Sequence, residues 1–410
     1  MCRHLTTENG ENLARVWLLT GVGAAHDICC VACDSADGPV ELIVACEGCV
    51  DRVDDESGVT AIRGVPGIAE RPEPVSVELT RTRMPLAPLD IAAVPDRPGE
   101  WLLLGRRRVL HWHADSGKTL RSMRFRLPKS GVDSSFRNRP PHPRIHAAPG
   151  GGYAAVVIDY GRRGVVLDLR RGVVTMRLDR GAYHPETQPF PIAFTAVADE
   201  LLLVHGSDWN RLDLSDPATG TLLTPRSTEW QRGQPRPEHY LDYFHGRLHC
   251  SPSGQWIADD GWVWHPVGVP HVWNVHRWRL RDIWESDDGS SIQWLCTRDY
   301  HWDSPMCWLD DERLVISGIG GDDLALIPGV RIFDPVTGQE VIQFAGPSGA
   351  LHSDGRRLYS AGPAGTQVWD PTTGHRTGTV PGFTPTHHQP ASHELASIDS
   401  DTLIRWHIPN

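Results

Sequence analysis

A segment that repeats near the C-terminus constrains the fold of this chain more than any other feature. Residues 330–338 read Val-Arg-Ile-Phe-Asp-Pro-Val-Thr-Gly, and residues 366–374 read Thr-Gln-Val-Trp-Asp-Pro-Thr-Thr-Gly. Between the two copies, Asp354-Gly355 separates two short strand-like stretches, and an Asp-Gly pair in that position is typical of a tight hairpin turn. A further short strand follows each Thr-Gly turn. The repeating unit is therefore predicted to be four short antiparallel strands joined by turns.

The element made of a third strand and its following turn recurs through the whole chain. Copies lie at residues 50–58, 109–117, 165–172, 211–220, 271–274, 330–338, 366–374 and 403–406. Four-stranded units that return every 40–50 residues or so are typical of β-propeller blades. One blade cannot bury both faces of its sheet, so blades stack on one another and the ring must close. We therefore predict an all-β fold, a single closed β-propeller of four-stranded antiparallel blades, with eight blades rather than seven.

The predicted propeller spans residues 1–410 as one domain. Val16-Trp17-Leu18-Leu19-Thr20-Gly21 resembles the first strand of a complete opening blade, which is the reason for expecting eight blades. Apolar stretches such as 101–104 and 153–158 are separated by turns and not by amphipathic helices, which argues against a parallel α/β sheet. Two stretches rich in Pro and Arg, 66–88 and 127–143, do not fit the blade pattern and are expected to be long surface loops.

The strongest blades resemble the WD-repeat family. Val368-Trp369-Asp370 matches the dipeptide that names the family, and residues 395–397 and 403–406 match the last two strands of its repeat. Weaker versions of the turn before the second strand are Asp37-Gly38 and Ser253-Gly254. This resemblance to a degenerate, bacterial-type member implies a propeller that serves as an interaction scaffold, although one fold hosts many functions.

Composition limits the classes of partner. The formal net charge is -11 and the sequence pI is about 6.0, and no run of Lys and Arg dominates, so we expect no nucleic-acid partner. No apolar stretch is long enough to span a membrane, and no secretory signal is recognised at Met1, so we expect a cytoplasmic protein with no membrane partner. It is expected to be monomeric. A disulfide framework is not expected from the nine cysteines in that compartment.

Four of the cysteines have the spacing of a zinc site. Cys30-x-x-Cys33 is followed by Cys46-x-x-Cys49, and two thiolate pairs can hold Zn²⁺ tetrahedrally. The repeat places Cys30 and Cys33 within one strand, where an odd separation points the side chains to opposite faces. We therefore interpret these cysteines as small core residues, expect no metal and no cofactor, and leave zinc as the alternative.

Residues 239–308 have the most unusual composition in the chain. They contain Trp256, Trp262, Trp264, Trp273, Trp278, Trp284, Trp294, Trp302 and Trp308, out of 16 tryptophans in total. Tryptophan can also fill the gaps between blades, as we expect for Trp112, Trp369 and Trp406, and we favour that role for Trp264 and Trp273. Trp262 and Trp302 lie next to carboxylates in turn-like contexts, so we expect these two to be exposed for binding.

The sequence thus predicts a non-catalytic interaction protein that binds a protein partner or a small ligand on one face of the ring. The predicted binding residues are Asp242, His245, Asp259, Asp260, Trp262, Asp299, His301 and Trp302. No catalytic residue is assigned. The alternative is a propeller enzyme of the lyase or hydrolase type, with a central pocket lined by His, Tyr and Asp of residues 239–308. That alternative requires the carboxylates and histidines to converge in a deep pocket.

Three histidines occupy the same place in the repeat. His146, His249 and His352 each fall in a strand just before a turn. A side-chain type that recurs in register indicates a repeated packing or hydrogen-bonding role, so we expect these histidines to be structural.

Overall fold

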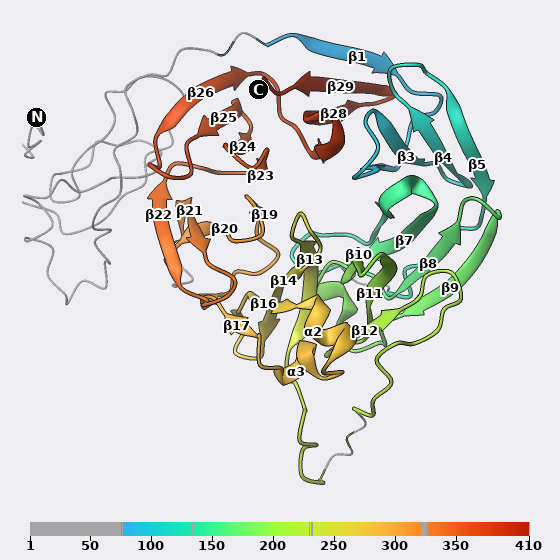
Figure 1. The fold of residues 1–410 in the computed structure, drawn as a ribbon, viewed down its shortest axis with the longest axis vertical. Coiled ribbons are helices and arrows are strands. Elements are labelled where there is room, and N and C mark those ends of the chain that lie inside the picture. The colour runs from blue at the N-terminus through green and yellow to red at the C-terminus, as the bar shows by residue number, and fades with distance from the viewer. Residues whose placement is uncertain are drawn as a thin grey trace, which may run out of the picture.

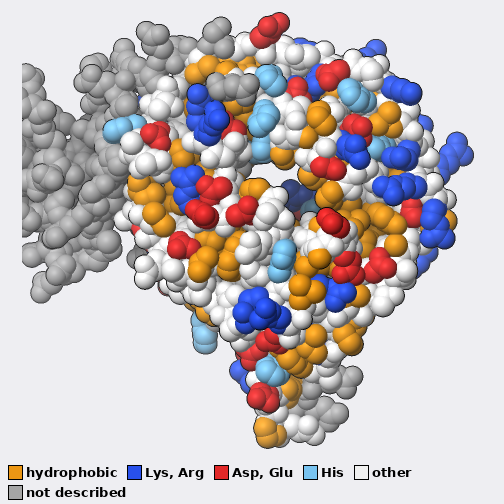
Figure 2. Space-filling model, viewed as in Figure 1, with side chains coloured by type: hydrophobic (Ala, Val, Ile, Leu, Met, Phe, Trp, Pro, Cys, Tyr) orange, Lys and Arg blue, Asp and Glu red, His pale blue; other side chains and the backbone are white. Residues whose placement is uncertain are grey.

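The computed structural model describes residue 75 and residues 77–132, 135–228, 230, 233–320 and 326–409. Within these residues the strands form seven antiparallel sheets arranged as blades around a ring (Figure 1). The prediction of an all-β propeller is confirmed, and the prediction of eight blades is wrong, because the ring closes with seven. The ring is hollow at its centre (Figure 2).

The first three blades follow one another along the chain, each running from an innermost to an outer strand. Blade 1 contains β2 (Asp90–Ala93), β3 (Glu100–Leu104), β4 (Arg108–His113) and β5 (Thr119–Arg124). Blade 2 contains β6 (His142–Ala147), β7 (Tyr153–Asp159), β8 (Arg163–Asp168) and β9 (Val173–Asp179), with a 3-10 turn η2 (Pro149–Gly151). After η3 (Pro185–Thr187), blade 3 contains β10 (Ile192–Val197), β11 (Glu200–Asp208) and β12 (Arg211–Ser215).

Blade 4 is the irregular one. It contains β13 (Phe244–Cys250), β14 (Trp256–Val263), β16 (His271–Asn274) and β17 (Gln293–Trp294), extended by β15 (Val267–Gly268) and β18 (Arg298–Asp299). Two short helices, α2 (Val275–Leu280) and α3 (Glu285–Asp288), lie between β16 and β17. Blade 5 contains β19 (Met306–Trp308), β20 (Leu314–Ile319), β21 (Ile327–Phe333) and β22 (Glu340–Ala345), and blade 6 contains β23 (Ala350–Ser353), β24 (Leu358–Gly362), β25 (Gly365–Trp369) and β26 (Arg376–Pro381).

The last blade explains why there are seven blades. Its β27 (His387–Gln389), β28 (Glu394–Asp399) and β29 (Thr402–His407), with a 3-10 turn η4 (Pro390–Ser392), come from the C-terminus. Its outer strand is β1 (Leu79–Arg83), which pairs antiparallel with β29. A strand from the stretch expected to be a loop at 66–88 therefore completes the final blade. The copy at 50–58 and the strand at 16–21 lie outside the described residues, so the single-domain assignment of residues 1–410 stays a prediction.

The repeated Asp-x-x-Thr-Gly turn has the same geometry wherever it occurs. In blade 6, Asp370 accepts hydrogen bonds from the Thr372 amide and the Thr373 hydroxyl, both at 2.8 Å. The Gly374 amide donates to the Asp370 carbonyl at 2.8 Å, and Gly374 has a φ of 73°. A left-handed φ of this kind favours glycine, which explains why the repeat ends on that residue.

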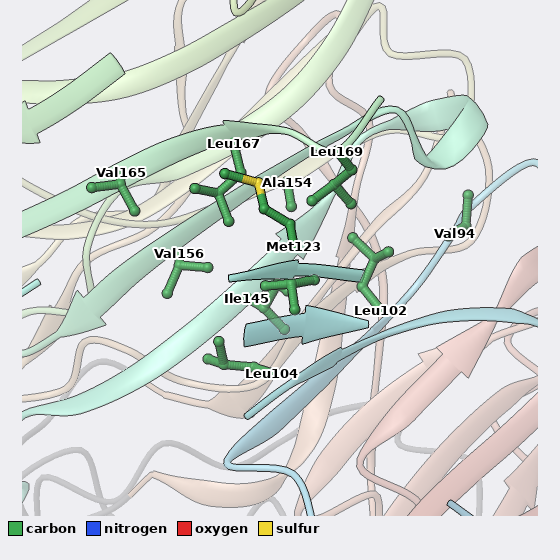
Figure 3. Close-up of a cluster of buried hydrophobic side chains, with 11 residues drawn as sticks. Val94, Leu102, Leu104, Met123, Ile145, Ala154, Val156, Val165, Leu167 and Leu169 are labelled. Atoms are coloured by element: carbon green, nitrogen blue, oxygen red, sulfur yellow. The ribbon is translucent and has the colours of Figure 1, made fainter. Parts of the chain in front are cut away.

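The core lies between neighbouring blades. Figure 3 shows one such cluster, in which Leu102 and Leu104 of blade 1 pack against Val156, Val165 and Leu167 of blade 2. Both faces of these strands are buried, as the apolar stretches of the sequence predict. Trp112, Trp369 and Trp406 are buried too, which confirms that they fill the gaps between blades.

Candidate functional site

Chain connections gather at the end of the ring where the innermost strands begin, which we name the loop face. The described parts of the connections that lead into blades 3, 4 and 5, at residues 180–191, 216–228 with 233–243, and 300–305, all lie there. The turns between second and third strands lie at the same end, because the strands of each blade alternate in direction. Side chains from five different segments of the chain can therefore meet on this face.

A stack of five aromatic rings crosses the loop face. Phe244 is stacked on Trp262 with ring centroids 4.2 Å apart and an interplanar angle of 7°. Trp262 is stacked on Trp302 at 4.9 Å, and Trp302 on Phe136 at 6.0 Å. At the other end Tyr183 is stacked on Phe244 at 5.8 Å. Offset stacking of this kind adds to the energy of burying the rings, so the stack ties the connections of the loop face together.

The middle of this stack is buried. Trp262 is 3% exposed and Trp302 is 5% exposed, so the expectation that these two residues are exposed is wrong. The Trp302 indole donates to the Thr187 carbonyl at 3.0 Å. With its amide oriented to accept, the Gln188 side-chain oxygen lies 3.0 Å from the Trp262 indole nitrogen. Neighbouring rings on both sides cover the two tryptophans, which local sequence context does not reveal.

The exposed end of the stack opens into a groove between blades 3 and 4, with a volume of about 980 Å³. Its exposed aromatic side chains are Tyr183, Trp230 and Trp264, which are 45%, 39% and 44% exposed. The groove is also lined by Trp209, Tyr240, Ser207, Asn210, Thr228, Asp208, Arg211, Asp213, Arg236 and Asp242. Trp264 was expected in the core but is exposed, whereas Trp273 is buried as expected.

Most charged groups in this groove are already paired. Arg211 contacts Asp213 at 3.0 Å, and the exposed Arg236 contacts Asp242 at 2.9 Å. The Arg236 guanidinium also lies 5.0 Å from the centroid of the Tyr240 ring. Asp208 is exposed at the edge of the groove and accepts only the Trp209 amide, at 2.8 Å, among the described residues. The groove therefore combines flat aromatic surfaces with polar groups that can orient a ligand.

The predicted residues His245, Asp259 and Asp260 lie below the groove and have structural roles. His245 Nδ1 is 2.7 Å from Asp259 Oδ2, and both side chains are fully buried. Asp260 contacts the buried Arg298 guanidinium at 2.5 Å and accepts the Ser304 amide at 2.6 Å. Burial raises the pKa of Asp260 to about 6, although Arg298 opposes the shift. These two pairs join β13, β14 and β18 to the connection that leads into blade 5.

The eight predicted binding residues therefore do not share one open site. Asp242 lines the groove, and Trp262 contacts Trp264 beneath it. Asp299 is exposed on β18, and His301 is half-buried in the turn that follows. Trp209 and Tyr183 line the groove as well, and neither was predicted as a binding residue. Asp208-Trp209 carries the signal used for Trp262 and Trp302, a tryptophan beside a carboxylate in a turn, but it lies outside the tryptophan-rich stretch.

An ionic network on the loop face links segments that are far apart in the sequence. Asp303, in the connection to blade 5, contacts Arg139 at 2.6 Å and accepts the hydroxyl of Tyr160; both partners belong to the part of the chain around blade 2. Arg247 of β13 contacts the same carboxylate at 3.4 Å. Burial raises the pKa of Asp303 to about 6. The network therefore joins the connection between blades 4 and 5 to β13 of blade 4 and to the chain around blade 2.

Four innermost strands carry a histidine at the same level. His146, His249, His352 and His388, which we name the channel histidines, each precede the last pair of the hairpin by one residue. Burial lowers the pKa of His352 to about 3 and the pKa of the other three to about 4. They are therefore neutral at pH 7. The repeated register seen in the sequence thus extends to a fourth histidine.

The predicted residues do not form the accessible catalytic pocket that the enzyme alternative requires. A catalytic acid or base must reach substrate, and the His245–Asp259 pair is sealed from solvent. Among the described residues, no group of three or more His, Cys, Asp or Glu side chains is placed to hold a metal ion. Cys30, Cys33, Cys46 and Cys49 lie outside the described residues, so their assignment stays a prediction. No described helix is long and apolar enough to cross a membrane.

Seven blades arranged in a ring define a seven-bladed β-propeller fold, and solved structures agree. The chain is similar to a chain in a crystal structure of the mitotic checkpoint complex, with a TM-score of 0.50, 14% identity and coverage of 86% of this chain and 99% of that one. It is similar also to the β-propeller domain of Cps50 (Swd1) from Myceliophteria thermophila, with a TM-score of 0.50, 10% identity and coverage of 82% and 100%. At this identity the similarity shows the fold alone.

Sequence comparison adds no closer relationship. No family model matches the chain, and no curated protein matches it.

Proposed function

We propose that this chain is a divergent WD-repeat protein that binds a protein partner in the groove between blades 3 and 4. The observation that carries the proposal is the exposure of Tyr183, Trp230 and Trp264 around one hollow of the loop face. Exposed aromatic side chains grouped in a concave surface are typical of the residues that dominate binding energy at interfaces. The Val368-Trp369-Asp370 motif and the fold support the assignment to an interaction scaffold.

The stacked rings beneath the groove support this proposal because they hold its walls in place. Phe244 packs against Tyr183, Trp209 and Trp264, with ring centroids 4.6–5.8 Å apart. A rigid aromatic surface loses little conformational entropy when a partner binds. The groove therefore needs no rearrangement before it accepts a segment of another protein.

The test is affinity purification from the native cell followed by titration of each purified partner. The double variant Tyr183→Ala, Trp264→Ala is compared with the wild type and with Trp294→Ala, a matched control because Trp294 is 47% exposed on the outer strand of blade 4. Loss of two exposed aromatic side chains is expected to lower the affinity for a partner that binds in the groove by about 30-fold or more. Unchanged affinity of every partner for the double variant would overturn the proposal, as would an equal loss in Trp294→Ala.

A further inference from the structure

A second surface, on blades 1 and 2, is strongly basic. Two adjoining hollows of about 850 and 690 Å³ share Arg124, Phe125 and Arg126. The first lies between the β3–β4 turn and the end of β5, and the second between the end of β5 and strands β8 and β9. Together they are lined by eight basic residues, which we name the arginine surface: Arg106, Arg107, Arg108, Arg124, Arg126, Lys129, Arg163 and Arg177.

The arginine surface lacks internal neutralisation. Its one lining carboxylate, Asp179, is already bonded to Arg162 and lies 3.7 Å from Arg163. Arg106, Arg107, Arg108, Arg124 and Arg126 form no ion pair within the described ranges of the chain, and all five are exposed. Arginines elsewhere on the ring are commonly paired, as Arg313 is with Asp310 and Arg331 with Glu340.

This concentration of positive charge runs against the charge of the whole chain. The formal net charge is -11, so the rest of the chain carries an excess of acidic residues. Figure 2 shows Lys and Arg side chains gathered along the rim of the ring over β5 and β9. Like charges at close range repel one another, and an anionic ligand relieves that repulsion while it gains its own contacts.

We propose that the arginine surface docks an acidic segment of a partner protein. Guanidinium groups bind carboxylates through paired, directional hydrogen bonds, which a flexible ammonium group does not offer. Leu86 and Phe125 lie among the arginines and provide apolar contact for a side chain between the acidic residues. The segment binds in extended form along the trough from the β3–β4 turn to β9.

The charge of the remaining protein favours a short acidic peptide over nucleic acid. A duplex or long single strand extends beyond a surface of this size and meets the acidic remainder of the chain, where it is repelled. A short segment covers the arginines alone. The site is separate from the groove between blades 3 and 4, so it can be occupied or lost independently of that groove.

The test is fluorescence anisotropy with the full-length chain and three labelled probes. The probes are a ten-residue peptide alternating Glu and Asp around one central Leu, the same peptide with Gln and Asn in place of the acids, and a ten-nucleotide single-stranded DNA. The variant Arg107→Glu, Arg126→Glu is compared with Arg281→Glu, Arg356→Glu, which makes the same change in net charge at exposed arginines far from the surface. Thermal unfolding of both variants confirms that they fold.

The acidic peptide is expected to bind the wild type and the control variant with equal affinity, and the Arg107, Arg126 variant at least about tenfold more weakly. Affinity is expected to fall with added salt, and the amide peptide not to bind. Three results would overturn the proposal: no binding of the acidic peptide at physiological salt, an equal loss in the control variant, or tighter binding of DNA than of peptide through the same arginines.

Discussion

Asp260 was predicted from the sequence to be a binding residue, but the structure gives it a structural role. Replacement of Asp260 with alanine distinguishes the two roles. Asp260 and Arg298 are both fully buried, with 2.5 Å between carboxylate oxygen and guanidinium nitrogen. Alanine leaves the Arg298 guanidinium buried without its carboxylate, and it also removes the acceptor of the Ser304 amide, which lies 2.6 Å from Asp260. Removal of one partner from a buried ion pair costs about 3–5 kcal/mol, so Asp260→Ala is expected to lower the free energy of unfolding by that amount.

The assay is urea unfolding followed by tryptophan fluorescence, with the free energy extrapolated to water. The double variant Asp260→Leu, Arg298→Met is the control, because it removes both charges and fills the space with apolar side chains. Such replacements of whole buried pairs are often neutral, so the double variant is expected to recover most of the lost stability. If Asp260→Ala unfolds at the same urea concentration as the wild type, the structural role is refuted. If the double variant is as unstable as the sum of its single changes, the pairing of Asp260 with Arg298 is refuted.

The remaining predictions concern the repeat and the buried titratable groups. Gly374→Ala is expected to destabilise the ring by about 1 kcal/mol in urea unfolding, because Gly374 has a φ of 73°. Trp369→Ala is expected to cost about 3–5 kcal/mol, since Trp369 is buried and its indole donates to Ser360 at 2.9 Å; a loss below about 1 kcal/mol would contradict its core role. The four channel histidines have pKa values lowered to about 3–4, so the unfolded chain binds more protons between pH 4 and 6.5 and their contribution to stability rises with pH. The carboxyls with pKa raised to about 6, Asp303 among them, act in the opposite direction but are fewer, so melting temperatures are expected to increase from pH 4 to 6.5, and a flat profile would contradict this.

Local sequence predicted the blades well because each blade is built from neighbouring strands. Seven of the eight copies found in the sequence coincide with third strands, from β4 to β29. The turn that ends on Gly374 needs only Asp370, Thr373 and a residue free to adopt a left-handed φ, all within five positions. Such contacts depend on short-range backbone geometry, so they can be predicted from the local sequence alone.

Exposure of the tryptophans could not be predicted in the same way. Trp262 and Trp264 are two residues apart in sequence, yet one is buried and the other is 44% exposed. The difference arises because Trp262 is stacked between Phe244 and Trp302, which come from other segments of the chain. A carboxylate next to a tryptophan marks a turn, but it does not show which distant ring covers the indole.

The sequence by itself determined that the chain forms a ring of short antiparallel blades, five of them four-stranded as predicted, because strand, turn and period are local properties repeated along it. The tertiary structure decided where the ring closes, through the pairing of Leu79–Arg83 with the last strand, a contact between residues more than 300 positions apart. It decided as well that Tyr183 and Trp264 share a groove, and that Arg107 and Arg126 share a surface. Pairing and convergence of this kind depend on closure of the whole ring, and no local pattern of residues encodes them.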